Sequence, residues 1–317
     1  MRYKIAMICQ PEYFRFCYEN DLKEFGDIYE FKYHFGMSET DFIPLCNFQA
    51  DINIFFRGER VPLQVLEQLK GIKVNLSSEP FPGYIDGKFK YTKDSLIRYL
   101  DFRQIRALPY DYVFHYDAAS LNVMGKDGLL LSGAFPFPVA TGTYHPVQMK
   151  NRWDFFFIGR STIHRERYFG YLKHRYNFLH ICHGIWGPEL VEYMQSSKIC
   201  INVHAEDEIS WEPRMQMMLA CGVFVISEKI TPNDILRPGI DYIEIGNRSE
   251  LREAAVYYLH HESERKQIAE SGYRQVCDKL DSKIVFKKLF DDILANRIQK
   301  FSVGKRSRLY DVVQLFI

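Results

Sequence analysis

The sequence predicts an α/β fold made of two domains, each a parallel sheet covered by helices, that face each other across a cleft. Short apolar runs alternate along the chain with segments of helical periodicity, which is typical of a doubly wound sheet. A stretch dense in proline and glycine, Phe135–Pro146, interrupts this alternation near the middle, and a second series follows it. Both domains are therefore expected to be Rossmann-like.

The composition supports two ordinary globular domains. Hydrophobic residues make up 47% of the 317 residues and charged residues 26%, which is enough apolar material for two cores. The 41 basic residues nearly cancel the 40 acidic ones, so no overall field favours nucleic acid or an anionic membrane.

The same inventory predicts a cytoplasmic protein. No apolar run approaches the roughly 18 to 20 residues that cross a bilayer, and the apolar start at Ile5–Ile8 is too short for a signal peptide. The seven cysteines are an odd number without CxxC spacing, as in a reducing compartment.

In the first half, runs of apolar residues predict strands, and apolar residues at helical spacing predict helices. The expected strands are residues 4–9, 28–33, 52–56, 73–76, 112–115 and 129–131. The expected helices are residues 63–69, which follow Pro62, and 93–108. We expect this domain to span residues 1–148.

The second half repeats the alternation. The expected strands are residues 153–158, 178–182, 198–203, 223–227 and 241–245. The expected helices are residues 161–176, 188–195, 212–221, a helix capped by Ser249, 262–280 and 284–299. Gly222 supplies the left-handed stop after residue 221. We assign residues 149–300 to this domain and 301–317 to a returning helix or an interaction tail.

One stretch carries a recognisable pattern, SSKICINVHAEDEISWEPRMQMMLACGVFVIS at residues 196–227. A strand ending in Asn202 is followed by a polar loop, then by Arg214 and the run Ala220-Cys221-Gly222. In this order and spacing it resembles the C-terminal domain of GT-B fold glycosyltransferases, particularly their CgeB-like (spore-maturation) branch. The run at residues 237–276, and Gly159-Arg160 with Arg165 upstream, are similar to the same family over about residues 150–295.

The resemblance implies an activity. It implies a hexosyl- or pentosyltransferase that takes sugar from a nucleotide-sugar substrate, without a metal or another cofactor. Residues 149–300 would then hold the donor, and residues 1–148 the acceptor. A glycan, a small metabolite, a protein side chain and a modified nucleic-acid base all remain open as acceptors.

The donor leaves as a diphosphate, which calls for N–H groups or cations aimed at its oxygens. The glycine at Gly159 begins a turn into a helix whose N–H groups are expected to meet phosphate. Arg160 and Arg214 are the candidate cations, because a planar guanidinium suits phosphate oxygens. Within the resemblance, Asn202 belongs to the matched pattern, and Met217 replaces the glutamate that holds the donor ribose.

Four more residues are donor-site candidates. His183 and Trp186 follow the second strand of this half, where Trp186 would stack on the base. His204 closes the third strand, and a histidine there points toward the ligand edge of the sheet. With Met217 in place of the family glutamate, either the donor site is weakened or altered, or Glu212, one turn earlier, has a supporting role. Each also has an ordinary structural explanation, as a core or surface residue.

An inverting transfer needs a general base for the acceptor hydroxyl, whereas a retaining one does not. The carboxylates Glu12, Glu59, Glu79 and Asp117 follow strands of the first half. We take Glu59 first, because Gly58 before it allows close approach, and Asp117 second. A helix cap or a surface charge is the alternative for each.

Other functions on the same fold stay open. The replacement at Met217 favours a catalytically reduced nucleotide-sugar-binding protein, and an NDP-sugar epimerase would use the same architecture. A dinucleotide oxidoreductase is disfavoured, since Met7-Ile8-Cys9-Gln10-Pro11 stands where G-x-G-x-x-G would be needed.

Overall fold

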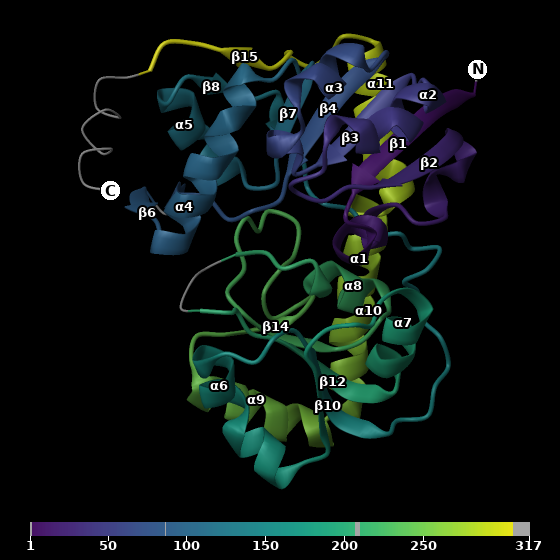
Figure 1. The fold of residues 1–317 in the computed structure, drawn as a ribbon. Helices are drawn as coiled ribbons and strands as arrows, with labels where there is room; N and C mark the ends of the chain where they lie inside the picture. The colour runs from purple at the N-terminus through teal and green to yellow at the C-terminus, as the bar shows by residue number, and fades with distance from the viewer. Residues whose placement is uncertain (1, 86, 207–209, 307–317) are drawn as a thin grey trace. The chain divides into compact units, whose positions relative to one another are not determined.

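The computed structural model describes residues 2–85, 87–206 and 210–306. They form two compact units (Figure 1). Unit 1 takes in residues up to Arg15, then Leu22–Pro136 and the chain from Lys287 onward, and unit 2 takes in Phe16–Asp21 and Phe137–Phe286. Compared with the predicted boundary at residue 148, unit 2 starts inside the proline-rich segment and also recruits a short N-terminal piece. Residues 307–317 of the predicted tail lie outside the described residues.

Unit 1 is built on a sheet of six parallel strands in the order β2-β1-β3-β4-β7-β9. The strands are β1 (Tyr3–Cys9), β2 (Gly26–Lys32), β3 (Ile52–Phe56), β4 (Ile72–Ser77), β7 (Tyr112–His115) and β9 (Gly133–Ala134). The last five residues of β1 and all of β3 are buried. Burial on both faces explains why these strands read as continuous apolar runs.

The helices of unit 1 are short. They are α1 (Pro11–Phe14), α2 (Ile43–Phe48), α3 (Leu63–Gln68), α4 (Lys93–Phe102) and α5 (Ala118–Lys126). The helix predicted over 93–108 is shorter in the structure. α4 stops at Phe102, and a 3₁₀ turn, Arg103–Ala107, follows it. Two small antiparallel pairs complete the unit: β5 (Gly83–Ile85) with β6 (Lys88–Lys90), and β8 (Leu129–Leu130) with β15 (Ser302–Val303), which lie side by side in Figure 1.

Unit 2 contains a second parallel sheet, in the order β11-β10-β12-β13-β14. Its strands are β10 (Trp153–Ile158), β11 (Phe178–Ile181), β12 (Ser197–Asn202), β13 (Val225–Glu228) and β14 (Ile243–Ile245). Its helices are α6 (Ile163–Arg175), α7 (Gly187–Gln195), α8 (Arg214–Ala220), α9 (Arg248–His260) and α10 (Glu262–Lys279). The helix α11 (Ser282–Leu294) begins in unit 2, and its residues from Lys287 belong to unit 1.

Two helix starts differ from the prediction. The helix expected from Glu212 begins at Arg214, because Pro213 disfavours helical backbone at the residue before it. The helix expected to be capped by Ser249 is capped by Asn247, whose side chain accepts the N–H groups of Ser249 and Glu250. Asparagine is as good an N-cap as serine, so the sequence pattern alone did not separate them.

Both sheets share one topological property that positions ligands. In each, the second strand lies outside the first, and the later strands extend the sheet on the other side. The chain therefore leaves in opposite directions after β1 and β3 in unit 1, and after β10 and β12 in unit 2. Such a switch point opens a crevice beyond the carboxyl ends of the two strands, where doubly wound sheets bind ligands. No helix formed by the described residues is long and apolar enough to cross a membrane.

Candidate functional site

The switch point of unit 2 gathers charged side chains. Gly159 follows β10, and Val203 and His204 follow β12. Arg165 reaches this edge from the first turn of α6, and Arg214 from the first residue of α8. Two arginines, each from the start of a helix, thus lie at the carboxyl end of the sheet.

Arg214 is held in place by four groups, the most distant of which is the Ile158 carbonyl, 3.5 Å from its Nη1. Its Nε donates to Oδ1 of Asn202 at 2.7 Å, and its Nη2 donates to the Val203 carbonyl at 3.0 Å and to Oε1 of Glu212 at 2.9 Å. The amide of Asn202 is itself fixed, because its Nδ2 donates to Oγ of Ser227 at 2.8 Å. Asn202 therefore orients the guanidinium group.

Arg165 lies beside it and is buried. Its Nε donates to the same Val203 carbonyl at 2.9 Å, and its Nη1 donates to the carbonyl of Arg160 at 2.9 Å. Burial and the neighbouring charge of Arg214 lower the pKa of Arg165 to about 10, so it stays protonated at neutral pH. Its Nη2 is 3.8 Å from Oε1 of Glu212. Two guanidinium groups thus share the carboxylate of Glu212, and the charges of Glu228 and Arg160 also act on this pair.

Gly159 gives these cations room. Its φ of 145° lies in the region that favours glycine, and a Cβ here would stand 3.2 Å from Nη1 of Arg165 and 3.3 Å from Nη1 of Arg214. The N–H of Gly159, expected to face a phosphate, already donates to the carbonyl of Ile181 at 2.9 Å. Any larger residue at position 159 would therefore press on both guanidinium groups.

Glu212 and His204 form a buried ion pair next to the arginines. Nδ1 of His204 is 2.8 Å from Oε2 of Glu212, and its Nε2 donates to the carbonyl of Lys229 at 2.7 Å. Burial alone would lower the pKa of His204, but Glu212 outweighs it and raises that pKa. Burial would raise the pKa of Glu212, yet Arg214, His204 and Arg165 bring it down to about 2. Glu212 is thus ionised at neutral pH, and its charge favours the protonated form of His204.

His204 and Glu212 were expected to contact the donor, but both side chains make hydrogen bonds within the protein. Both of the His204 ring nitrogens already have protein partners. Glu212 holds Arg214 and His204 rather than standing free. Among the described residues, no group of three or more His, Cys, Asp or Glu side chains is placed to hold a metal ion.

Met217 lies in the middle of α8 and is partly buried. A thioether is at best a weak acceptor, so it cannot hold ribose hydroxyls as a carboxylate does. The neighbouring Gln216 is buried and occupied: it accepts from Nε1 of Trp211 at 2.5 Å and donates to the carbonyl of Phe137 at 3.2 Å. Gln216 therefore gives no substitute for the missing carboxylate.

The remaining donor candidates are solvent-accessible. Arg160 and His183 are exposed, and Trp186 is 45% exposed at the N-cap position of α7. An exposed tryptophan beyond the end of β11 presents an indole face to a planar ligand.

In unit 1, Glu59 follows β3 at the corresponding switch point. It is 5% exposed, and burial raises its pKa. Its Oε1 is 3.7 Å from Nε of Arg57, while Oε2 is buried without a hydrogen-bond partner. Arg57 adopts left-handed backbone, with φ of 61°. A non-glycine residue in this conformation at the end of a strand is a recurrent feature of ligand sites.

The other carboxylates of unit 1 are engaged. Asp117 is the N-cap of α5 and accepts the Ala119 N–H at 2.8 Å. Glu12 pairs with Lys32. Glu79 pairs with Arg57 at 2.8 Å. Of the four, Glu59 is the one with a buried, unpartnered oxygen.

Sequence reasoning did not nominate Arg165 as a site residue, although it belongs to the pattern quoted above. The available signal was its place three residues after Thr162, which caps α6. That turn, directly after β10, aims the first helical residues at the carboxyl edge of the sheet. Glu228 was missed as well: it ends β13 and accepts the N–H of His204 at 2.7 Å.

The comparisons with known proteins agree with this geometry. The family model described as "Glycosyl transferase-like" matches residues 145–290. Residues 145–290 form a glycosyl transferase-like domain. The matched range includes the whole charged cluster of the unit 2 switch point. The narrower resemblance of this glycosyl transferase-like domain to the CgeB-like branch stays a prediction. No curated protein matches the chain by sequence.

Solved structures resemble the chain over nearly its whole length. An alpha-glucosyltransferase in complex with UDP and a 13-mer DNA containing a HMU base is 12% identical, with a TM-score of 0.61. Sucrose-phosphate synthase from Thermosynechococcus elongatus is 8% identical, with a TM-score of 0.60, and Alr3699/HepE from Anabaena, in complex with UDP and glucose, is 10% identical, with a TM-score of 0.58. Each alignment covers 93% of this chain and 100% of the other. The predicted fold class, GT-B, is confirmed.

Proposed function

We propose that the protein is a glycosyltransferase whose nucleotide-sugar donor binds at the switch point of unit 2. The observation that carries the proposal is the pair Arg165 and Arg214, which share the carboxylate of Glu212 beside Gly159. With Arg160, which also acts on Arg165, the three arginines outnumber the two carboxylates Glu212 and Glu228, and this balance suits a diphosphate. Because these guanidinium groups are held by carbonyls and by Asn202 before any ligand arrives, they need little reorganisation when charge develops on the leaving group.

In the proposed reaction the bond between the sugar anomeric carbon and the diphosphate oxygen breaks, and a bond to the acceptor oxygen forms. The guanidinium groups offset the charge on the departing diphosphate, in place of a metal. For an inverting transfer we propose Glu59 as the base that takes the acceptor proton. A carboxylate whose pKa is raised by burial is a stronger base than an exposed one. Asp117 is the second candidate, and its oxygens already serve α5.

Trp186 is proposed to stack on the base, with His183 and Arg160 at the accessible border of the donor site. The proposed acceptor is a hydroxyl on a glycan or a small molecule, or a modified nucleic-acid base. One solved structure of similar fold, the alpha-glucosyltransferase, is a complex with DNA, which supports testing the last of these.

Met217 favours a second candidate, a protein that binds nucleotide-sugar but transfers slowly or not at all. One experiment separates the functions. The full chain is incubated with UDP-, GDP-, TDP- and ADP-sugars and candidate acceptors, and released nucleoside diphosphate is measured. Release that requires acceptor supports a transferase. Binding without release supports the second candidate, and inversion at sugar C2 without transfer would indicate an epimerase. Neither binding nor release with any donor would refute the proposal.

A further inference from the structure

A cavity lies at the edge of the unit 2 sheet opposite the arginine pair. It encloses about 690 Å³ at the amino ends of β12 and β13 and is lined from residues 147–151, 195–198, 222–224 and α10. The volume is within the roughly 300–1,000 Å³ of small-molecule sites. The arginine pair stands at the carboxyl ends of the same strands, so this cavity is separate from the proposed donor site.

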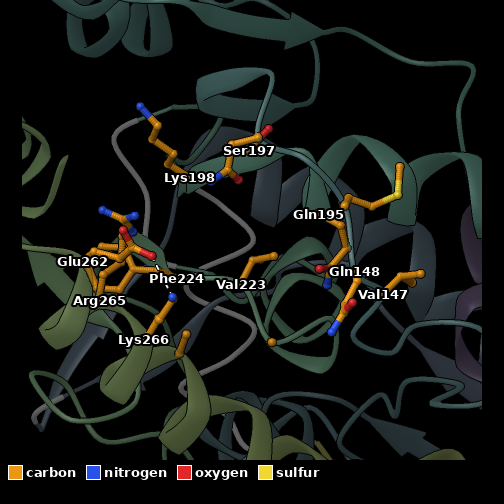
Figure 2. Close-up of a pocket in the computed structure, with 14 residues that line it drawn as sticks. Val147, Gln148, Gln195, Ser197, Lys198, Val223, Phe224, Glu262, Arg265 and Lys266 are labelled. Carbon is orange, nitrogen blue, oxygen red and sulfur yellow. Dashed lines mark ion pairs between the residues drawn. The ribbon is translucent and has the colours of Figure 1, made fainter.

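One wall of the cavity is basic. Figure 2 shows Arg265, Lys266 and Glu262 of α10 gathered on one side, with the ion pair between Lys266 and Glu262 at 2.6 Å. Lys198 enters from the start of β12, where its Nζ pairs with Asp154 at 2.7 Å. The lining thus carries three cations and one carboxylate.

Arg265 is the unusual member. It is 7% exposed, and its Nη1 donates to the carbonyl of Tyr258 at 2.5 Å. Its Nε and Nη2 make no hydrogen bond to the described residues, and they are not among the buried atoms that lack a partner, so they are open to water or to a ligand in the cavity. Its planar fork matches a phosphate group.

The opposite wall is neutral and polar. Gln148 and Gln195 lie there, away from α10 (Figure 2). Nε2 of Gln195 donates to the Cys221 carbonyl, which leaves its Oε1 as the acceptor of this amide. Side-chain amides offer acceptors and donors of the kind that bind hydroxyl groups.

We propose that this cavity binds a sugar phosphate, with its phosphate on Arg265 and Lys266 and its hydroxyls on Gln148 and Gln195. Glu262 is the group that the phosphate displaces from Lys266. Both partners of that ion pair are largely exposed, and exposed pairs are weak, so a dianion can outcompete the carboxylate.

The test is calorimetric titration of the full chain with glucose 6-phosphate, inorganic phosphate and glucose at low salt. We expect glucose 6-phosphate to bind, inorganic phosphate to bind more weakly, and glucose not to bind. Lys266→Ala should weaken glucose 6-phosphate binding severalfold. Glu262→Gln should strengthen it about two- to fivefold, the worth of an exposed ion pair. Glu270→Gln, a matched change on the same helix outside the cavity, should have no effect.

Two further arms separate this site from the donor site. Arg214→Lys should leave glucose 6-phosphate binding unchanged, and saturating UDP should not displace it. Displacement by UDP, absence of binding, or an affinity unaffected by both Lys266→Ala and Glu262→Gln would each overturn the proposal. None of these outcomes depends on whether the chain transfers sugar.

Discussion

Nε of Arg214 donates a 2.7 Å hydrogen bond to Oδ1 of Asn202, the last residue of β12. This contact ties a cation on one element to the end of a strand on another, with Ser227 of β13 fixing the amide behind it. The direction of the guanidinium fork is therefore set by the sheet itself. The first prediction follows from that dependence.

Replacing Arg214 with lysine keeps the charge but removes the fork. Because a single ammonium group cannot hold Asn202, Glu212 and a phosphate together, we expect turnover at saturating donor to fall at least about tenfold. The measurement is nucleoside diphosphate release under steady-state conditions. Arg274→Lys, an exposed arginine paired with Glu270, is the matched control. An unchanged rate in Arg214→Lys would remove this residue from the site.

The ion pair of His204 and Glu212 predicts how stability depends on pH. The folded-state pKa of His204 is raised by Glu212, so its contribution is complete below the unfolded pKa of about 6.5 and is lost as pH rises through the folded value. We expect the melting temperature to fall between pH 6 and pH 9 more in the native chain than in His204→Gln. Equal slopes in the two proteins would contradict the assignment.

A nucleoside diphosphate should stabilise the protein against heat. A ligand that binds only the native state adds about 2.7 kcal/mol at one hundred times its Kd. Thermal shift with UDP, GDP, TDP and ADP would identify the base, and Arg214→Lys should reduce the shift. A full shift that survives in this variant would place the diphosphate elsewhere.

Trp186 should contribute to the binding of that diphosphate. Stacking of a base on an aromatic ring is worth about 1–3 kcal/mol, so Trp186→Ala should raise the Kd severalfold or more. Titration calorimetry measures this directly. Tyr257→Ala, which removes an exposed ring on α9, serves as control. Equal affinities in the native chain and Trp186→Ala would leave Trp186 as a surface residue.

Glu59 and Asp117 should respond differently to mutation. Loss of a general base costs about 10²–10⁴ in rate, so Glu59→Gln should abolish most turnover while the protein stays folded. The native rate should rise as pH increases through the raised pKa of Glu59, since the ionised form is the base.

Asp117→Ala should instead lower the free energy of unfolding by about 0.5–2 kcal/mol, the cost of a lost N-cap. Rate profiles from pH 5 to 9 and denaturant unfolding test the two. A retaining enzyme would keep its rate in Glu59→Gln.

Local patterns predicted the elements well where local physics decides them. Strands β3, β7 and β10 have their predicted bounds. β3 and β7 are fully buried, and such parallel strands appear as nearly uninterrupted apolar runs. The predicted helix starts were wrong where one residue determines the start, namely Pro213 before α8 and Asn247 before α9.

The site was predictable in type but not in detail. The sequence indicated cations at the carboxyl edge of the second sheet, and Arg214 is there. That the Gly159 N–H is bonded to Ile181, and that Arg165 lies against Gly159, depends on packing between elements far apart in the chain. The partition of Phe16–Asp21 into unit 2 is of the same kind, since it rests on long-range bonds such as Ala140 N–H to the Phe16 carbonyl.

That partition determines when each unit can finish folding during synthesis. Unit 2 includes the six residues Phe16–Asp21, and Asp21 accepts a hydrogen bond from Ser282. Unit 1 includes the chain from Lys287 onward, and Phe301 donates its N–H to the Asp111 carbonyl. Unit 2 is therefore incomplete until the ribosome has reached Phe286, and unit 1 until it has passed Lys287. Cutting the gene near residue 137 would therefore yield two fragments, each lacking a piece that the other carries.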